Sequence, residues 1–147
     1  MLRRLYNYMR LIGLDLGSRT LGVAISDELG MLAHAYDTFR FRDDDYESAI
    51  KYTIEVCEKE NVKEIVLGYP KHMNGDSGIR ASISVSFKEE LEKRADLKVY
   101  LEDERLTTII VDKAMIAGNM RREKRREKKD EMAAVVILQG YLDRKAF

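Results

Sequence analysis

The sequence predicts an α/β fold in which helices flank a mixed five-stranded sheet. Three segments with strand character follow one another near the N-terminus, with only short turns between them. Two further short apolar segments then alternate with stretches whose apolar residues recur at helical spacing. Short turns join antiparallel strands and helical crossovers join parallel ones, so we expect the first three strands to be antiparallel and the later ones parallel.

An acid and two glycines lie around the junction of the first two strands. Residues 11–14 form an apolar run typical of a strand buried on both faces, and Asp15 follows it directly. Gly17 and Gly22 allow the backbone to bend or to be approached closely. The second strand has apolar residues at every other position, at Leu21, Val23 and Ile25. A third strand is expected over residues 31–42.

A helix, a strand and a second helix are expected next. The acids at 43–45 favour a helix start because they lie at the positive end of the helix dipole, and an amphipathic pattern then runs to about Glu60. Residues 65–67 form a short buried strand, which Pro70 ends. A loop is expected over residues 71–78. Beyond it, an apolar stripe at four-residue spacing marks a helix, at Ile79, Ile83, Phe87 and Leu91.

The C-terminal third is expected to contain one more strand and two helices. Residues 97–101 form the strand, which the polar cluster at 102–105 stops. Thr107 or Thr108 can cap a helix that runs to about Ala117. The last helix is expected over residues 130–142. It is apolar nearly all round, so we expect it to be mostly buried.

Size and composition indicate one domain with its own core. The chain has 147 residues with 26 Lys plus Arg and 26 Asp plus Glu, so any nucleic-acid contact must come from a local patch. The single cysteine, Cys57, excludes an intramolecular disulfide and is expected to be a core thiol. No apolar run approaches membrane-spanning length. We therefore expect a cytoplasmic protein without a membrane partner, in which residues 1–8 are an N-terminal extension and residues 9–147 form the domain.

Three acids lie at junctions between the expected elements. Asp15 follows the first strand, Glu104 follows the last strand, and Asp130 begins the last helix. The carboxyl ends of parallel strands open on one edge of a sheet, where Asp15 and Glu104 would meet. Carboxylates that share a site need a cation, and Mg²⁺ or Mn²⁺ prefers such oxygen ligands. Two such ions can cleave a phosphodiester bond. Each acid also has a structural interpretation, as a turn residue, a loop residue and a helix N-cap respectively.

A dense basic run directly precedes Asp130. Beside a metal site, it would hold a phosphate backbone through contacts that do not depend on base sequence and that weaken with salt. A run of charges that is simply solvated fits the same pattern. No aromatic residue is interleaved, so we expect no base stacking from this segment. The candidate nucleic-acid-binding residues of the run are Arg121, Arg122, Lys124, Arg125, Arg126, Lys128 and Lys129.

The loop after residues 65–67 is the third candidate region. It starts at Gly68 and brings Lys71 and backbone amides toward a helix N-terminus, an arrangement that can receive a phosphate. Lys71 and Arg105 are the candidate substrate contacts. His72 is expected on the loop surface, because a metal-activated water needs no separate general base, and His34 is expected to be structural.

Four motifs stand out along the chain. They are Asp-Leu-Gly-Ser-Arg-Thr-Leu-Gly-Val-Ala-Ile-Ser-Asp at 15–27, Gly-Tyr-Pro-Lys-His-Met-Asn-Gly at 68–75, Asp-Glu-Arg-Leu-Thr-Thr at 103–108, and Lys-Asp-Glu-Met-Ala-Ala-Val-Val-Ile-Leu-Gln-Gly-Tyr-Leu at 129–142. In this order and spacing they resemble the bacterial YqgF family, and the resemblance covers almost the whole chain from Met9. It implies an RNase H-like fold and a metal-dependent nuclease that either trims the 5′ end of precursor 16S rRNA or resolves Holliday junctions. Asp15, Glu104 and Asp130 fall on the expected acidic triad of that family.

The resulting hypothesis is a Mg²⁺- or Mn²⁺-dependent nuclease for structured nucleic acid, with precursor 16S rRNA as the first candidate substrate and a Holliday junction as the second. Resolving a junction takes two symmetric cuts and therefore a homodimer, whereas a monomer can trim RNA. Two other classes stay open. One is an actin-like ATP-binding domain, since Asp-Leu-Gly also opens that phosphate loop. The other is an inactive RNA-binding module that uses the basic run alone.

Overall fold

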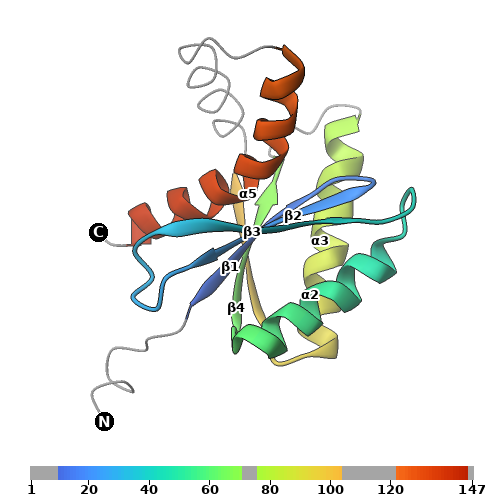
Figure 1. Cartoon of the computed structure of the whole chain (residues 1–147). Helices are drawn as coiled ribbons and strands as arrows, with labels where there is room; N and C mark the ends of the chain where they lie inside the picture. The colour runs from blue at the N-terminus through green and yellow to red at the C-terminus, as the bar shows by residue number, and fades with distance from the viewer. Residues whose placement is uncertain (1–9, 71–75, 104–121, 146–147) are drawn as a thin grey trace.

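The computed structural model describes residues 10–70, 76–103 and 122–145, with residues 76–77 and 122–131 described by their backbone only. The expected N-terminal extension, residues 1–8, and the expected helix after Thr107 lie outside these ranges. The described elements are β1 (Leu11–Leu16), β2 (Thr20–Ser26), β3 (Ala33–Arg40), α2 (Tyr46–Glu60), β4 (Glu64–Tyr69), α3 (Asp76–Arg94), β5 (Lys98–Asp103) and α5 (Arg122–Lys145). The sheet lies in the middle, with α5 on one face and α2 and α3 on the other (Figure 1).

The five strands form one mixed sheet in the order β3-β2-β1-β4-β5. β1 pairs antiparallel with β2, and β2 pairs antiparallel with β3. The pairs β1–β4 and β4–β5 are parallel. This confirms the sheet expected from the sequence. It also places β1 at the centre, with its carboxyl end on the same edge of the sheet as the carboxyl ends of β4 and β5.

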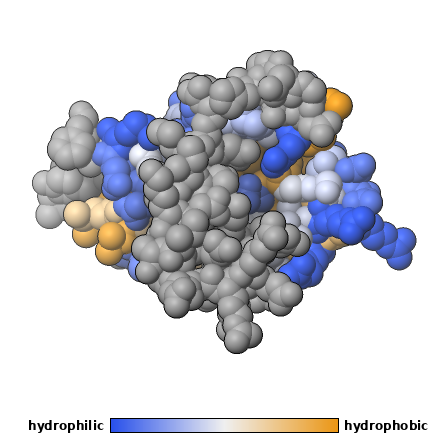
Figure 2. All heavy atoms as spheres, turned by 90° about the horizontal axis from the view of Figure 1, so that it is seen from above, coloured by the Kyte–Doolittle hydropathy of each residue, from blue (hydrophilic) through white to orange (hydrophobic). Residues whose placement is uncertain are grey.

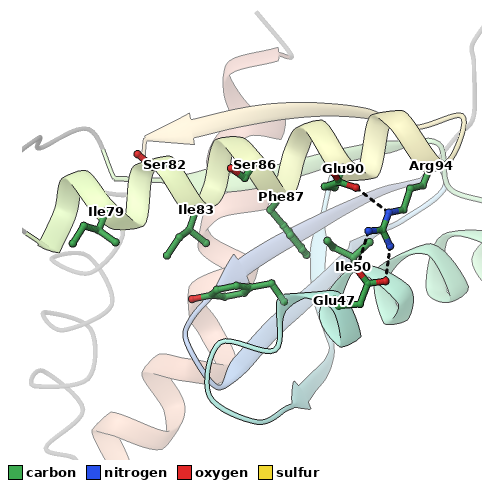
Figure 3. Close-up of a pocket in the computed structure, with 10 residues that line it drawn as sticks. Glu47, Ile50, Ile79, Ser82, Ile83, Ser86, Phe87, Glu90 and Arg94 are labelled. Carbon is green, nitrogen blue, oxygen red and sulfur yellow. Dashed lines mark hydrogen bonds and ion pairs between the residues drawn. The ribbon is translucent and has the colours of Figure 1, made fainter.

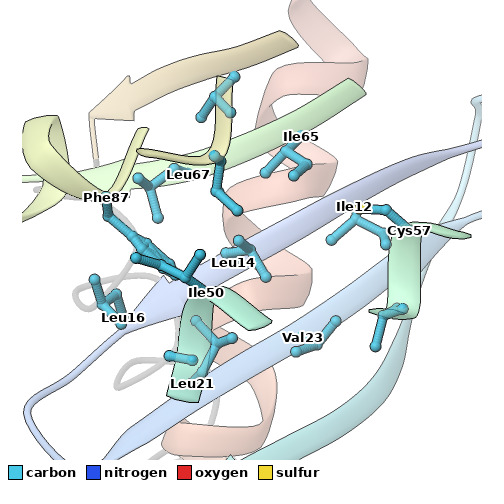
Figure 4. Packing of buried hydrophobic residues seen from close by; sticks show 14 of the residues in the cluster. Ile12, Leu14, Leu16, Leu21, Val23, Ile50, Cys57, Ile65, Leu67 and Phe87 are labelled. Atoms are coloured by element: carbon cyan, nitrogen blue, oxygen red, sulfur yellow. The ribbon is translucent and has the colours of Figure 1, made fainter. Parts of the chain in front are cut away.

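The central strand is buried because helices cover both faces of the sheet. On the α5 face, Leu11 packs against the apolar side of that helix. On the other face, Cys57 of α2 belongs to the core cluster, and burial raises the pKa of its thiol to about 12, as expected of a core thiol. The same cluster joins β1 to α2 and α3 (Figure 4), with contributions from Ile12, Leu14, Leu16, Ile50 and Phe87.

The starts of two helices differ from the sequence-based expectation. α3 begins at Asp76, so the end of the expected 71–78 loop is helical. α5 begins at Arg122, so Asp130 lies about two turns inside the helix and not at its head. Arg, Lys and Glu are good helix formers, so the basic run can extend the helix without an apolar stripe of its own.

Two strands also begin or end at residues other than those expected from the sequence. β3 covers Ala33–Arg40, which is shorter at both ends than the expected 31–42. β5 continues through Glu102 to Asp103, although this polar pair was expected to stop it. Asp103 is still paired with Tyr69 of β4. Backbone pairing with β4 therefore continues through this polar pair, whatever the polarity of its side chains.

α5 is buried on one side only, although its sequence predicts burial nearly all round. Met132 is 38% exposed, and Tyr141 is half-buried. No helix in the described ranges is long and apolar enough to cross a membrane. The buried side of α5 faces the sheet and consists of Ala134, Ile137, Leu138 and Leu142.

A Gly13→Ala substitution is expected to destabilise the fold by about 1–3 kcal/mol. A Cβ at Gly13 would lie 2.6 Å from the Cβ of Leu138 and 2.9 Å from the backbone oxygen of Ala134, so α5 would have to move away from the sheet. The midpoint of urea unfolding measures the effect. Gly78→Ala is the matched control, because its new Cβ meets no atom within 4 Å and alanine favours the helix. Equal midpoints for Gly13→Ala and the wild type would contradict this account of the contact between α5 and the sheet.

Candidate functional site

Asp15 lies near the carboxyl end of the central strand, opposite Gly22 of β2, and is half-buried. Gly13, two residues earlier, faces α5, since a Cβ there would meet Leu138. Residues of a strand alternate between its two faces, so Asp15 shares the α5 face of the sheet with Gly13. The candidate acid therefore lies where the central strand leaves the core, on the face covered by the helix that contains Asp130.

The carboxyl ends of β1, β4 and β5 lie side by side, as the sequence predicts. Glu102 of β5 forms an ion pair with Arg144 of α5, so its side chain is on the α5 face. By alternation Asp103 is on the opposite face. The alignment of the three strands follows from the pairs Leu14 with Leu67 and Leu67 with Leu101.

None of the other predicted site residues has a described side chain. Glu104, Arg105, Lys71 and Arg121 are outside the described residues altogether. Asp130 is described only as a backbone position of α5, four residues before the buried Ala134. Residues four apart share a face of a helix, so position 130 is on the sheet-facing side of α5. The remaining basic positions are also within α5 by their backbone, at Arg122, Lys124, Arg125, Arg126, Lys128 and Lys129.

The turn between β1 and β2 is held in place by the segment that leads into α2. The backbone N–H of Asp44 donates to the carbonyl of Ser18 at 2.9 Å. The guanidinium of Arg19 donates to the carboxylate of Asp43 at 2.7 Å and 3.2 Å, and this contact lowers the pKa of the Asp43 carboxyl. The turn next to Asp15 is thereby fixed at its backbone and at one exposed side chain.

A hollow of about 520 Å³ lies beside this turn, and we refer to it below as the turn hollow. Arg80 of α3 donates to the carbonyl of Leu16 at 3.4 Å, next to Asp15 in the chain. The pKa of Tyr46 is raised, first by burial and then by the hydrogen bond it donates to Asp44. The sequence reasoning missed Arg80, whose only signal was its place directly after the first residue of an apolar helix stripe. The lining residues are Leu16, Gly17, Ser18, Asp44, Tyr46, Ile79, Arg80, Ile83 and Ser84.

A second hollow, between α2 and α3, adjoins the first and shares Tyr46, Ile79 and Ile83 with it. Figure 3 shows Ile79 and Ile83 on the side of α3 that faces this space. At the far end, Arg94 closes it with ion pairs to Glu47 at 2.7 Å and to Glu90 at 3.0 Å (Figure 3).

Figure 2 shows the molecule from above, so that the viewer faces the end at which α3 and α5 begin in Figure 1. Most of the coloured residues in this view are hydrophilic, and the hydrophobic patches are separated from one another. Among the residues with described side chains, no three His, Cys, Asp or Glu residues are grouped so as to hold a metal ion. Of the predicted triad, only the side chain of Asp15 belongs to that set.

The chain is similar in sequence to known nucleases over nearly its whole length. The family profile described as "RuvX: Holliday junction resolvase" matches residues 9–144. A Bacillus subtilis (strain 168) protein named "Putative pre-16S rRNA nuclease" is 44% identical, over 92% of this chain and 98% of its own length. A protein of the same name from Geobacillus sp. (strain WCH70) is 46% identical, over 93% and 99%.

Solved structures with a similar fold include two Holliday junction resolvases. Thermus thermophilus RuvC, in complex with a Holliday junction substrate, aligns with a TM-score of 0.59 at 12% identity, over 93% of this chain and 96% of that one. The yeast mitochondrial resolvase Ydc2 aligns with a TM-score of 0.52 at 17% identity, over 99% and 86%. At these identities the similarity shows the fold, which is that of the RuvC-like nucleases.

Proposed function

Since this chain belongs to the RuvX (YqgF) family of nucleases, we propose that it trims the 5′ end of precursor 16S rRNA in the cytoplasm. The observation that carries this proposal is the similarity, at 44% and 46% identity over nearly the full length, to relatives named for pre-16S rRNA. Residues 9–147 would form the nuclease domain, and residues 1–8 an extension. Membership of a nuclease family leaves the actin-like ATP-binding domain and the inactive RNA-binding module without support.

Asp15, Glu104 and Asp130 are the proposed ligands of Mg²⁺ or Mn²⁺. Three features support this set. Asp15 is half-buried on the α5 face of the sheet, position 130 is on the sheet-facing side of α5, and Glu104 follows the strand whose end lies beside those of β1 and β4. Carboxylate oxygens suit these hard cations, and the cation offsets the repulsion between the carboxylates.

A bound pair of ions would supply an activated water and would stabilise the leaving oxygen of the cleaved phosphodiester. The contribution of this chain's own residues is to position the substrate. Asp15 is carried by a strand whose other positions are all buried, so its place is fixed by the core. The basic residues of α5, together with Lys71 and Arg105, would hold neighbouring phosphates through contacts that do not depend on base sequence.

A Holliday junction is the second candidate substrate. The description of the matching family and the RuvC-like fold favour it. Cleaving a junction symmetrically takes two active sites, so this alternative requires a homodimer.

A cleavage assay with both candidate substrates separates the two proposals. Purified protein is incubated with a 5′-extended 16S precursor fragment and with a four-way DNA junction, each with Mg²⁺, with Mn²⁺ and with EDTA. We expect shortening of the RNA only when a metal ion is present and no cleavage of the junction. Cleavage of the junction alone would replace the first proposal by the second. Cleavage of neither substrate, or equal cleavage in EDTA, would contradict both.

A further inference from the structure

The turn hollow lies at the same end of the sheet as Asp15 but on the opposite face. Leu16, which lines the hollow, is the neighbour of Asp15, and their Cα atoms are about 3.8 Å apart. A nucleic-acid strand that runs from Asp15 around the carboxyl end of β1 would therefore pass the hollow. Its volume of about 520 Å³ is within the range of roughly 300–1,000 Å³ typical of small-molecule sites, so it can take one nucleotide.

Arg80 gives the hollow a side that suits a phosphate. Its side chain is exposed, and the hydrogen bond to the Leu16 carbonyl holds the guanidinium at the end of β1. A guanidinium carries five N–H donors in a rigid fork, so it can bind a backbone carbonyl and a phosphate oxygen at once. The carboxylate of Asp44 would repel a phosphate. It can accept a hydrogen bond from a sugar hydroxyl or a base amino group on its own side of the hollow.

The apolar part of the lining suits the flat face of a base or a sugar. Ile79 is 63% exposed, so its side chain is accessible to a ligand in the hollow. Ile83 continues the same side of α3 (Figure 3), and Tyr46, at the start of α2, lines the same hollow. This combination of one cation, one acceptor and three apolar surfaces matches the parts of a nucleotide.

We propose that the turn hollow binds the nucleotide next to the cleaved phosphodiester, with Arg80 on its phosphate and Ile79 against its base or sugar. This rests on the nuclease activity proposed at Asp15. Arg80 and Ile79 determine how the substrate strand lies across the end of β1, and they take no part in the chemistry at the metal site.

Binding of the 5′-extended 16S precursor fragment in EDTA, measured over a series of salt concentrations, tests the two contacts separately. Arg80→Gln is expected to weaken binding about tenfold. It should also reduce the salt slope, which is the slope of log affinity against log salt concentration, by roughly 0.7–0.9, the value for one phosphate contact. Ile79→Ser is expected to weaken binding about threefold with an unchanged salt slope, because it removes apolar contact and no charge. Lys93→Gln is the matched control. It is an exposed cation on the same helix, about 20 Å from Arg80, and it should change neither quantity.

The outcomes distinguish this proposal from the proposed function. If the wild type cleaves RNA but Arg80→Gln binds like the wild type with an unchanged slope, the assignment of the hollow is wrong and the nuclease proposal stands. Equal losses for Arg80→Gln and Lys93→Gln would likewise show that only overall charge matters. If the wild type neither binds nor cleaves the fragment, both proposals are wrong. Urea unfolding of each variant identifies any loss that comes from the fold.

Discussion

Asp15→Asn is expected to lower the rate of RNA cleavage by about 10³-fold or more, with the fold intact. The substitution keeps the size of the side chain and removes the negative charge that would bind the metal ion. Loss of one principal electrostatic contact at a reacting centre typically costs about 10²–10³-fold in rate, and loss of a metal ligand removes more than one contact. Single-turnover cleavage of the 5′-extended fragment at saturating Mg²⁺ measures the effect.

Asp96→Asn is the matched control for Asp15→Asn. The side chain of Asp96 is 96% exposed and precedes β5, at the end of that strand away from the proposed site. The same acid-to-amide change should leave its cleavage rate within about twofold of the wild type, since surface substitutions of this kind have small effects. A rate for Asp15→Asn that is close to the rate for Asp96→Asn would contradict a catalytic role for Asp15.

Neutralising three basic positions of α5 is expected to weaken RNA binding about a hundredfold near physiological salt. In the triple variant, Arg122, Arg125 and Lys129 are changed to Gln, which is a good helix former and so preserves α5. Each lost phosphate contact should also reduce the slope of log affinity against log salt by about 0.7–0.9. Filter binding or fluorescence anisotropy over a salt series measures both quantities.

The control for the triple variant removes the same number of charges elsewhere. It changes three exposed lysines: Lys51 on α2, Lys63 just before β4, and Lys93 on α3. Changing them to Gln alters the net charge equally but touches no proposed contact. If this control loses as much affinity and slope as the α5 variant, RNA binding depends on net charge and the basic run has no special part in it.

The sequence was sufficient to predict the sheet and the place of Asp15, because both depend on local patterns. A run of apolar residues, an acid and two glycines defines the β1–β2 pair, and helical crossovers define the parallel strands. The start of α5 was predicted wrongly, since the expectation followed apolar periodicity whereas the helix propensity of Arg, Lys and Glu extends the helix to Arg122. The continuation of β5 through Asp103 depends on pairing with Tyr69, a residue distant in sequence.

Arg80 and the turn hollow could not be predicted from the sequence. Arg80 is one polar residue in a helix, and nothing nearby in the chain indicates that it reaches the carbonyl of Leu16. The hollow is lined by α3, whose Arg80 is bonded to Leu16 of β1, and by the segment before α2, which is bonded to the turn at Ser18. Such a site depends on the packing of three separate segments. The contact of Gly13 with α5 is a similar case, since only packing explains why that position has no side chain.

Calorimetric titration with Mn²⁺ tests the central claim most directly, because it measures the metal site without relying on cleavage. The wild type, Asp15→Asn and Asp96→Asn are titrated under the same buffer conditions. We predict that the wild type and Asp96→Asn bind Mn²⁺ with the same affinity, and that Asp15→Asn binds it at least about tenfold more weakly or loses a site. Identical Mn²⁺ binding by Asp15→Asn and the wild type would contradict the claim that Asp15 anchors the metal site.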